Sequence, residues 1–275
     1  MVFISKVPNV IVRVYFLNAI GVVLMRRFLA LYKVFMIDTL NNKFAFVFNL
    51  LLPTVYFLYT NWKLIFNPVD ISEKQILSGF EIYWAYIIFT TILNMVIFPT
   101  VFQRESGYYK EFYFIVGSKW KIFLANIVVQ TTVLLLEIII FDLIVTLVVR
   151  SWSWMFFLGG ILSALFFMIP ITLISSLFLA FRIKLQSISI IITITMFASF
   201  SLANISVHNW LGNLILLLNP IQYLISGSHA VSSLLGGDLD GAQIITQIII
   251  VTLIYILLGI WSLSRFDIKP ILNRA

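Results

Sequence analysis

The sequence predicts an all-α membrane protein with six transmembrane helices. Hydrophobic residues make up 61% of the 275 residues and charged residues only 11%, and the mean hydropathy is +1.07. These values exclude an ordinary soluble domain. The apolar residues gather in six long runs, and the basic residues between the runs are distributed very unequally. Composition, run length and charge distribution therefore favour one integrated membrane domain.

Each run is about long enough to cross a hydrocarbon core of ~30 Å at ~1.5 Å per helical residue. The predicted spans are Phe44–Phe66, Phe80–Val101, Ile122–Val149, Trp154–Phe181, Ser187–Val207 and Ala242–Leu263. Together they define a membrane domain over residues 44–263, which follows an N-terminal segment (1–43) and precedes a short tail (264–275).

Lysine and arginine fix the expected orientation. Fifteen of the 18 basic residues fall in the N-terminal segment, the tail and the two connections on the same side, and only Lys63, Lys74 and Arg150 fall on the other. Basic residues concentrate on the cytoplasmic side of membrane proteins. We therefore expect a multi-pass protein of the cell membrane with both termini in the cytoplasm.

The N-terminal segment predicts an amphipathic helix over Leu24–Asn42. At ~3.6 residues per turn, Arg26 and Lys33 share one face while Phe28, Phe35 and other apolar residues cover the rest. Such a helix lies in the membrane interface, where basic side chains meet anionic lipid headgroups. A cleaved signal peptide is disfavoured, because Arg26 and Arg27 directly follow the short apolar run Val14–Met25.

Two connections are longer than turns. Residues 102–121 form a cytoplasmic connection with both charge signs, and Gly107 and Gly117 delimit about two turns of helix over Tyr108–Val116. Residues 208–241 are too short for two further spans and predict an outer re-entrant segment of two helices, Trp210–Leu218 and Pro220–Leu235. Asn219 before Pro220 is a strong helix-start signal.

The inventory of reactive residues disfavours an enzyme. No cysteine is present, which excludes thiolate chemistry and cysteine metal sites. His208 and His229 match no ligand spacing, so no metal site is predicted. No phosphate-binding loop and no H-E-x-x-H motif occurs. The net charge of +7 follows membrane sidedness and forms no dense block, so nucleic-acid binding is not expected.

Polar residues inside the spans are the remaining candidates for function. Glu137 and Asp142 are carboxylates within the third span, where an ionised group costs about 2.5–3.5 kcal/mol on insertion scales. They are consistent with a proton relay or with carboxyls that face neighbouring helices. Two polar-aromatic stripes are consistent with a translocation path or with ordinary helix contacts. The stripes are Thr91, Asn94 and Phe98 on the second span, and Thr193, Phe197, Phe200 and Asn204 on the fifth.

Three short motifs carry a resemblance to a known family. Arg104-Glu105-Ser106-Gly107, followed by Gly117-Ser118-Lys119-Trp120-Lys121, resembles the loop between the second and third spans of type 2 ABC exporter permeases. Asn219-Pro220-Ile221-Gln222-Tyr223-Leu224 resembles the asparagine–proline–aromatic signature of the same family. The order of elements from about residue 24 onward also follows that family, whereas the preceding extension departs from it.

The resemblance implies a transport subunit without an ATPase of its own. The loop between spans two and three would form a coupling helix that docks into a separate ABC ATPase subunit, which would hold ATP and Mg. Carried over by position, the coupling residues are Arg104, Glu105, Gly107, Tyr108, Tyr109, Lys110, Glu111, Phe112 and Tyr113, and the re-entrant signature is Asn219, Pro220 and Tyr223. Phe112, Tyr113 and Phe114 are expected to face the cytoplasm.

The expected partners are ABC ATPase subunits, membrane lipid and a second permease copy, identical or related. The chain itself is expected to hold no cofactor. An apolar, aromatic lining would suit a hydrophobic or amphipathic substrate such as a lipid, drug or peptide. Two alternatives remain open: a secondary transporter coupled to protons through Glu137 and Asp142, and a membrane assembly partner that transports nothing.

Overall fold

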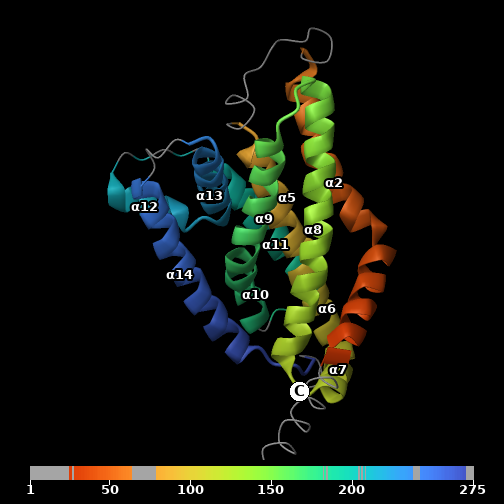
Figure 1. Cartoon of the computed structure of the whole chain (residues 1–275). Coiled ribbons are helices and arrows are strands. Elements are labelled where there is room, and N and C mark those ends of the chain that lie inside the picture. The colour runs from red at the N-terminus through yellow and green to blue at the C-terminus, as the bar shows by residue number, and fades with distance from the viewer. Residues whose placement is uncertain are drawn as a thin grey trace, which may run out of the picture.

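All regular structure in the described residues is helical (Figure 1). The structure is a computed structural model, and it describes residues 25–26, 28–63, 79–181, 183, 185–203, 205, 207, 209–237 and 242–270. Residues 28–41 form a first helix. The helices that follow are α2 (Lys43–Thr60), α5 (Glu81–Thr91), η1 (Ile92–Ile97), α6 (Phe98–Glu105), α7 (Tyr108–Val116), α8 (Lys119–Val149), α9 (Trp154–Ser175), α10 (Leu177–Ala180), α11 (Leu185–Leu202), α12 (Trp210–Leu217), α13 (Pro220–Leu235) and α14 (Ala242–Arg265).

Within the described residues, six helices are long and apolar enough to cross a membrane, which confirms the predicted number. They run over Lys43–Thr60, Glu81–Glu105, Lys119–Val149, Trp154–Ala180, Leu185–Leu202 and Gln243–Arg265. The α2 helix ends at Thr60, where the side-chain amide of Asn61 donates to the carbonyl of Phe57 (3.1 Å), and residues 64–66 of the predicted first span lie outside the described residues. The fifth helix ends at Leu202 rather than at the predicted Val207.

The second candidate span contains a π-helical segment, η1, that the sequence analysis missed. It lies directly before Pro99, which has no backbone N–H to continue the regular α-helical pattern. The N–H of Phe98 donates to the carbonyl of Leu93, five residues earlier, as a π-helix requires. Asn94 lies in this segment and donates a hydrogen bond to Asn49 of α2.

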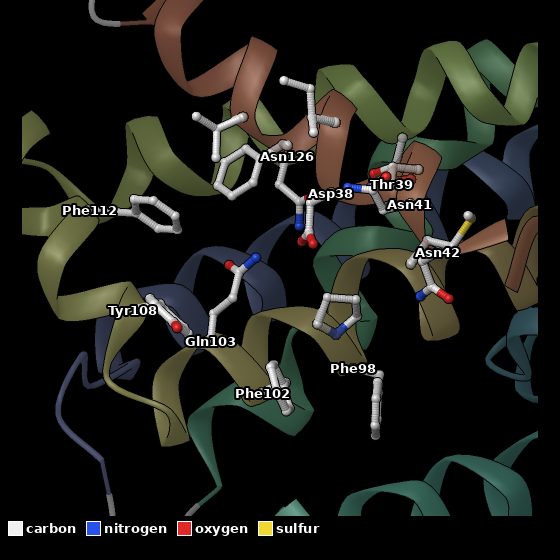
Figure 2. Close-up of a pocket in the computed structure, with 16 residues that line it drawn as sticks. Asp38, Thr39, Asn41, Asn42, Phe98, Phe102, Gln103, Tyr108, Phe112 and Asn126 are labelled. Carbon is white, nitrogen blue, oxygen red and sulfur yellow. Dashed lines mark hydrogen bonds between the residues drawn. The ribbon is translucent and has the colours of Figure 1, made fainter. Parts of the chain in front are cut away.

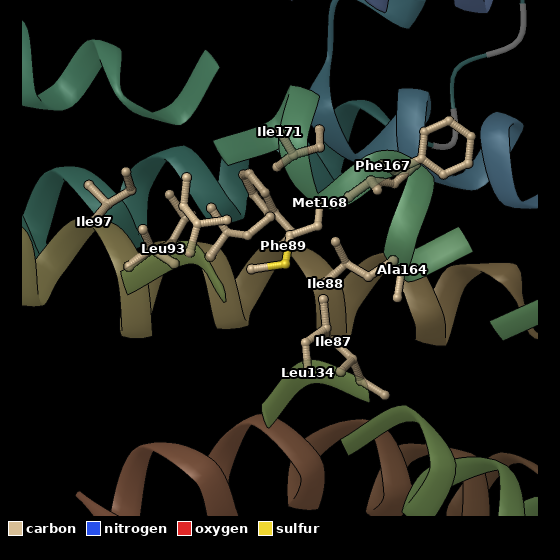
Figure 3. Packing of buried hydrophobic residues seen from close by; sticks show 14 of the residues in the cluster. Ile87, Ile88, Phe89, Leu93, Ile97, Leu134, Ala164, Phe167, Met168 and Ile171 are labelled. Carbon is tan, nitrogen blue, oxygen red and sulfur yellow. The ribbon is translucent and has the colours of Figure 1, made fainter. Parts of the chain in front are cut away.

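The core is built around α5, η1 and α9. Ile87, Ile88 and Phe89 pack with Leu134 of α8 on one side and with α9 on the other (Figure 3). The α9 helix also packs against α13 and α14, so it occupies the middle of the bundle (Figure 1). In contrast, only 17% of the residues of α2 and of α11 are buried, against 72% of the second span. These two helices form the outside of the bundle.

The predicted re-entrant segment is a pair of helices whose ranges match the prediction to within one residue. The axes of α12 and α13 are bent by 109° at Leu218 and Asn219. The α13 helix packs against α5, α9 and α14, in the half of the molecule away from α7 (Figure 1). Its backbone is therefore covered by protein, which is the condition for an interrupted helix pair within a membrane.

Candidate functional site

The α7 helix is a short element with defined ends. Gly107 precedes it with φ +87° and Gly117 follows it with φ +76°. This left-handed conformation is accessible to glycine at little cost and is strained for other residues. A helix over the predicted range Tyr108–Val116 is therefore present, and its role in coupling stays a prediction.

One face of α7 is fixed to the rest of the chain. The Tyr109 side chain is 1% exposed, and its hydroxyl donates to the carbonyl of Lys119 (3.1 Å). Its ring meets the Phe266 ring edge-on at 5.0 Å, and Phe112 meets Phe35 in the same way at 5.5 Å. Burial raises the pKa of the Tyr109 phenol, so the group stays a protonated donor at neutral pH.

Lys119, at the start of α8, holds the end of α14 close to α7. The ammonium of Lys119 donates to the carbonyls of Ser264 (2.8 Å) and Phe266 (2.9 Å). Together with the ring contacts of Tyr109 and Phe112, these bonds connect α7 to α8, to α14 and to the helix over residues 28–41. A displacement of α7 would therefore act on three other elements at once.

The opposite face of α7 is open. Its large apolar side chains Tyr108, Phe114 and Ile115 are 54%, 75% and 64% exposed. Lys110 and Glu111 are exposed between them, and the Lys110 ammonium lies 5.8 Å from the centre of the Phe114 ring. We refer to Tyr108, Lys110, Glu111, Phe114 and Ile115 as the α7 outer face.

Two of the three aromatic residues expected to face the cytoplasm point into the protein instead. Phe112 and Tyr113 are partly buried and pack against the core, and only Phe114 is mostly exposed. The helical period explains the difference, because residues three and four positions after Tyr109 share its buried face.

Arg104 and Glu105 form a buried ion pair and are not exposed for docking. The Arg104 guanidinium is 3% exposed, and it donates to the carbonyls of Leu179 (3.3 Å) and Ile183 (3.0 Å). Its Nε donates to a carboxylate oxygen of Glu105 at 2.8 Å, and the Glu105 side chain is 7% exposed. These bonds join the end of α6 to α10 and to the segment after it, so the chain enters α7 from a fixed position.

The asparagine–proline–tyrosine signature anchors the re-entrant pair. Asn219 Oδ1 accepts from the N–H of Ile221 (3.2 Å), and Nδ2 donates to the carbonyl of Ser199 in α11 (2.7 Å). Pro220 occupies the first turn of α13, where a missing N–H costs nothing. Tyr223 shares a hydrogen bond with Thr252 of α14 (2.6 Å), and its ring packs against Phe167 and Tyr255.

The predicted stripe on the second span belongs to a buried polar cluster. Thr91 donates to Glu137 Oε2 (2.5 Å), Asn49 Nδ2 donates to Thr91 (3.4 Å), and Asn94 Nδ2 donates to Asn49 Oδ1 (3.2 Å). Glu137 is fully buried, and its other oxygen has no hydrogen-bond partner in the described structure. Phe98, the third member of the stripe, lies apart from this cluster and lines a cavity near α7.

The predicted stripe on the fifth span lies on a different surface. Thr193 is exposed and donates to the Ser189 carbonyl of its own helix (2.9 Å), and Phe197 is 77% exposed. Phe200 packs against Tyr86 of α5, with ring centres 5.4 Å apart. Asn204 lies outside the described residues. Among the described residues of one chain, the two stripes therefore do not form a common lining.

Asp142 occupies a separate buried site on α8. Its Oδ1 accepts from the indole N–H of Trp84 (2.8 Å), and Oδ2 has no partner among the described residues. Glu137 and Asp142 thus have different partners and do not form one site, as their spacing along the helix predicts. Trp84 and Asn49 were not identified from the sequence, because their roles depend on how the helices pack.

His229 lies beside a carboxylate near the start of α5. Its Nδ1 lies 3.2 Å from Glu81 Oε1, and Glu81 Oε2 accepts from the N–H of Gly79 (2.6 Å). No group of three metal-binding side chains occurs in the described parts of the chain. His208 lies outside the described residues.

Comparisons with protein-family models, with curated proteins and with solved structures find no match in any of the three.

Proposed function

We propose that this chain is the membrane-spanning permease subunit of an ATP-driven exporter of the type 2 ABC class. In this proposal the chain lies in the cell membrane with both termini in the cytoplasm and pairs with a second permease copy. Two ABC ATPase subunits bind ATP and Mg. When they close, they push the α7 helices and switch a path between the two permeases from inward to outward access.

The α7 helix is the observation that carries the proposal. It is short, it is fixed on one face through Tyr109 and Phe112, and it exposes Tyr108, Phe114 and Ile115 on the other. Exposed aromatic and apolar residues among charges of both signs are typical of a protein-docking surface. Because α7 is tied to α8 and α14, a push on its outer face would reach two long helices.

The surfaces of α2 and α11 support pairing with a second copy. Both helices are largely uncovered, and they flank the second span, with α2 against α5 and α11 against α6. The exposed side chains include Leu51, Val55 and Phe197. An apolar face that brings two copies together would place the exposed α11 stripe at the interface. A path there would suit a hydrophobic or amphipathic substrate such as a lipid, drug or peptide.

Co-purification tests the proposal directly. The tagged chain, extracted in mild detergent from its native cells, should bring down a protein with ATP hydrolase activity that mass spectrometry identifies as an ABC ATPase. Phe114→Ser should reduce the recovered ATPase about tenfold, because truncation of a central apolar residue at an interface costs about 1–2 kcal/mol or more.

Phe181→Ser is the matched control. Phe181 is the same residue type, is 57% exposed and lies outside α7, in the connection after α10. Its substitution should leave ATPase recovery unchanged. If no ATPase is recovered with the native chain, or if both substitutions reduce recovery equally, the assignment of α7 is wrong.

A proton-coupled transporter is the second candidate, because Glu137 and Asp142 are fully buried carboxyls that each carry one oxygen without a partner among the described residues. The separation of their partners favours two structural sites over a relay. Transport that stops when the proton gradient is collapsed at constant ATP, and that is lost in Glu137→Gln, would favour this candidate over the ATP-driven one.

A further inference from the structure

A cavity of about 710 Å³ lies between the helix over residues 28–41, the α6 part of the second span, α7 and the first turns of α8 (Figure 2). Phe98, Phe102 and Phe112 supply apolar walls, and Asp38, Gln103 and Asn126 supply polar groups around the same space. A volume of this size holds a small molecule or part of a lipid. Neither the coupling proposal nor the buried carboxyls account for this cavity.

Part of the polar wall is held by its own hydrogen bonds. Gln130 lines the cavity and is 3% exposed. Both hydrogens of its amide nitrogen are used, one to Thr39 Oγ1 (2.8 Å) and one to Asn126 Oδ1 (3.3 Å). Its oxygen is buried and closed off from the cavity. Asp38, in contrast, lines the cavity with an exposed side chain, so its carboxylate is the acceptor that a ligand can reach.

The charge of the cavity lining favours a positively charged ligand. Asp38 is the only residue lining the cavity that is charged at neutral pH, and it forms no ion pair with another described residue. An uncompensated carboxylate beside carbonyl acceptors selects for a cation that carries hydrogen-bond donors. The aromatic walls add attraction for a cation and for an apolar chain.

We propose that this cavity binds the primary ammonium headgroup of an amphiphile, with its apolar chain against the phenylalanine walls. A primary ammonium has three donors and one positive charge, which match the charge and the acceptor oxygens of the Asp38 carboxylate. A trimethylammonium group has the charge but no donor. A carboxylate has neither and is repelled by Asp38.

Photolabelling of the purified full-length chain in phosphatidylcholine nanodiscs tests the proposal without any ATPase. The probes are three alkyl chains of equal length with the same diazirine, which end in a primary ammonium, a trimethylammonium or a carboxylate group. The ammonium probe should label peptides covering residues 34–42, 98–103 and 108–112 most strongly. Equal labelling of these peptides by all three probes would overturn the proposal.

Two variants probe the Asp38 carboxylate. Asp38→Asn should weaken labelling by the ammonium probe about tenfold, in line with the loss of a hydrogen bond to a charged group. Asn41 lines the same cavity, so Asn41→Asp added to Asp38→Asn should restore most of the labelling.

Asp267→Asn is the control, because it removes an equal charge from the segment after α14, outside the cavity lining. It should leave labelling unchanged. If labelling is not reduced in Asp38→Asn, or is reduced equally in Asp267→Asn, the ammonium probe does not bind in this cavity through Asp38. Since no ATPase takes part, such a failure would leave the ATPase-docking proposal untouched.

The same assay shows whether the natural ligand is a lipid headgroup or a free ammonium amphiphile. Nanodiscs that contain phosphatidylethanolamine should reduce labelling if the natural occupant is a lipid headgroup, and phosphatidylglycerol should not. Labelling that phosphatidylethanolamine leaves undiminished would identify a free ammonium amphiphile as the occupant. Both results require the same recognition by Asp38.

Discussion

Trp84 and Asp142 illustrate how single residues stabilise this bundle. The indole N–H donates to Oδ1 of a fully buried carboxyl, whose second oxygen has no partner in the described structure. Inside a membrane no water replaces a lost donor, so the loss leaves a buried polar group unsatisfied. The tryptophan ring also packs on Phe156.

We therefore expect Trp84→Phe to lower the free energy of unfolding by about 1–3 kcal/mol, which is the cost of leaving a buried acceptor without its donor. Thermal or denaturant unfolding of the purified chain in detergent measures the change. Trp154→Phe serves as the control, since Trp154 is 70% exposed, and surface substitutions usually change stability by less than about 0.5 kcal/mol. Equal effects of the two would contradict the role given to the indole N–H.

Gly160 marks the closest approach of α9 to the same carboxyl. A Cβ at this position would lie 2.7 Å from Asp142 Oδ2 and 2.8 Å from Cγ2 of Ile138. Gly160→Ala should destabilise the chain by about 1–3 kcal/mol through overpacking. Gly236→Ala, where a Cβ would lie 3.4 Å from its nearest neighbour, should have a much smaller effect in the same assay. If Gly160→Ala were neutral, the helices would have to be further apart than described.

At the residue scale, the sequence identified the unusual groups but not their partners. Glu137 and Asp142 are recognisable because carboxyls are rare in long apolar runs. Their hydrogen bonds to Thr91 and Trp84 depend on the rotation of α8 about its axis. That rotation cannot be derived from periodicity, since α8 is apolar on every side. For the same reason Arg104 was interpreted as a docking residue, whereas its guanidinium lies inside the protein.

At the element scale, local chemistry decided which boundaries could be predicted. The ends of α7 and the start of α13 agree with the prediction because Gly107, Gly117 and the Asn219–Pro220 pair have strong preferences of their own. The end of α2 depends on the Asn61 cap, and η1 depends on the turn before Pro99. Neither feature has a strong signal in an apolar run.

Gly117 provides a test of α7 as an element. Its φ of +76° should make Gly117→Ala cost about 1 kcal/mol of stability. Gly237 has φ +79° and lies after α13, in the half of the molecule away from α7. The two alanine variants should therefore lose similar stability in unfolding measurements. Only Gly117→Ala should reduce recovery of the ATPase, because it alone disturbs the end of α7.

The comparison of these two glycines separates coupling from stability. If both variants retain full ATPase recovery, docking on the outer face of α7 does not need a fixed helix end, and the proposed role of Gly117 in docking is wrong. If both lose recovery in proportion to stability, the loss reflects folding and not docking.

At the scale of the whole molecule, the bundle places its two distinctive ends far apart. The α7 helix lies at one end, and the connection between α8 and α9 lies at the other (Figure 1). The number of candidate spans could be predicted because each is a long apolar run. The order of helices around α9 could not, because apolar faces of similar character can pack in several ways. Orientation in the membrane depends on the distribution of basic residues alone.

The orientation can be measured with introduced thiols, because the native chain contains no cysteine. Phe114→Cys and Trp154→Cys each create a single thiol at a position that is 75% and 70% exposed, respectively. If the basic side is cytoplasmic, a membrane-impermeant maleimide should label Trp154→Cys in intact cells and Phe114→Cys only after lysis. The native chain should stay unlabelled in both conditions. The opposite pattern would place α7 outside the cell, where no ATP-hydrolysing subunit could reach its outer face.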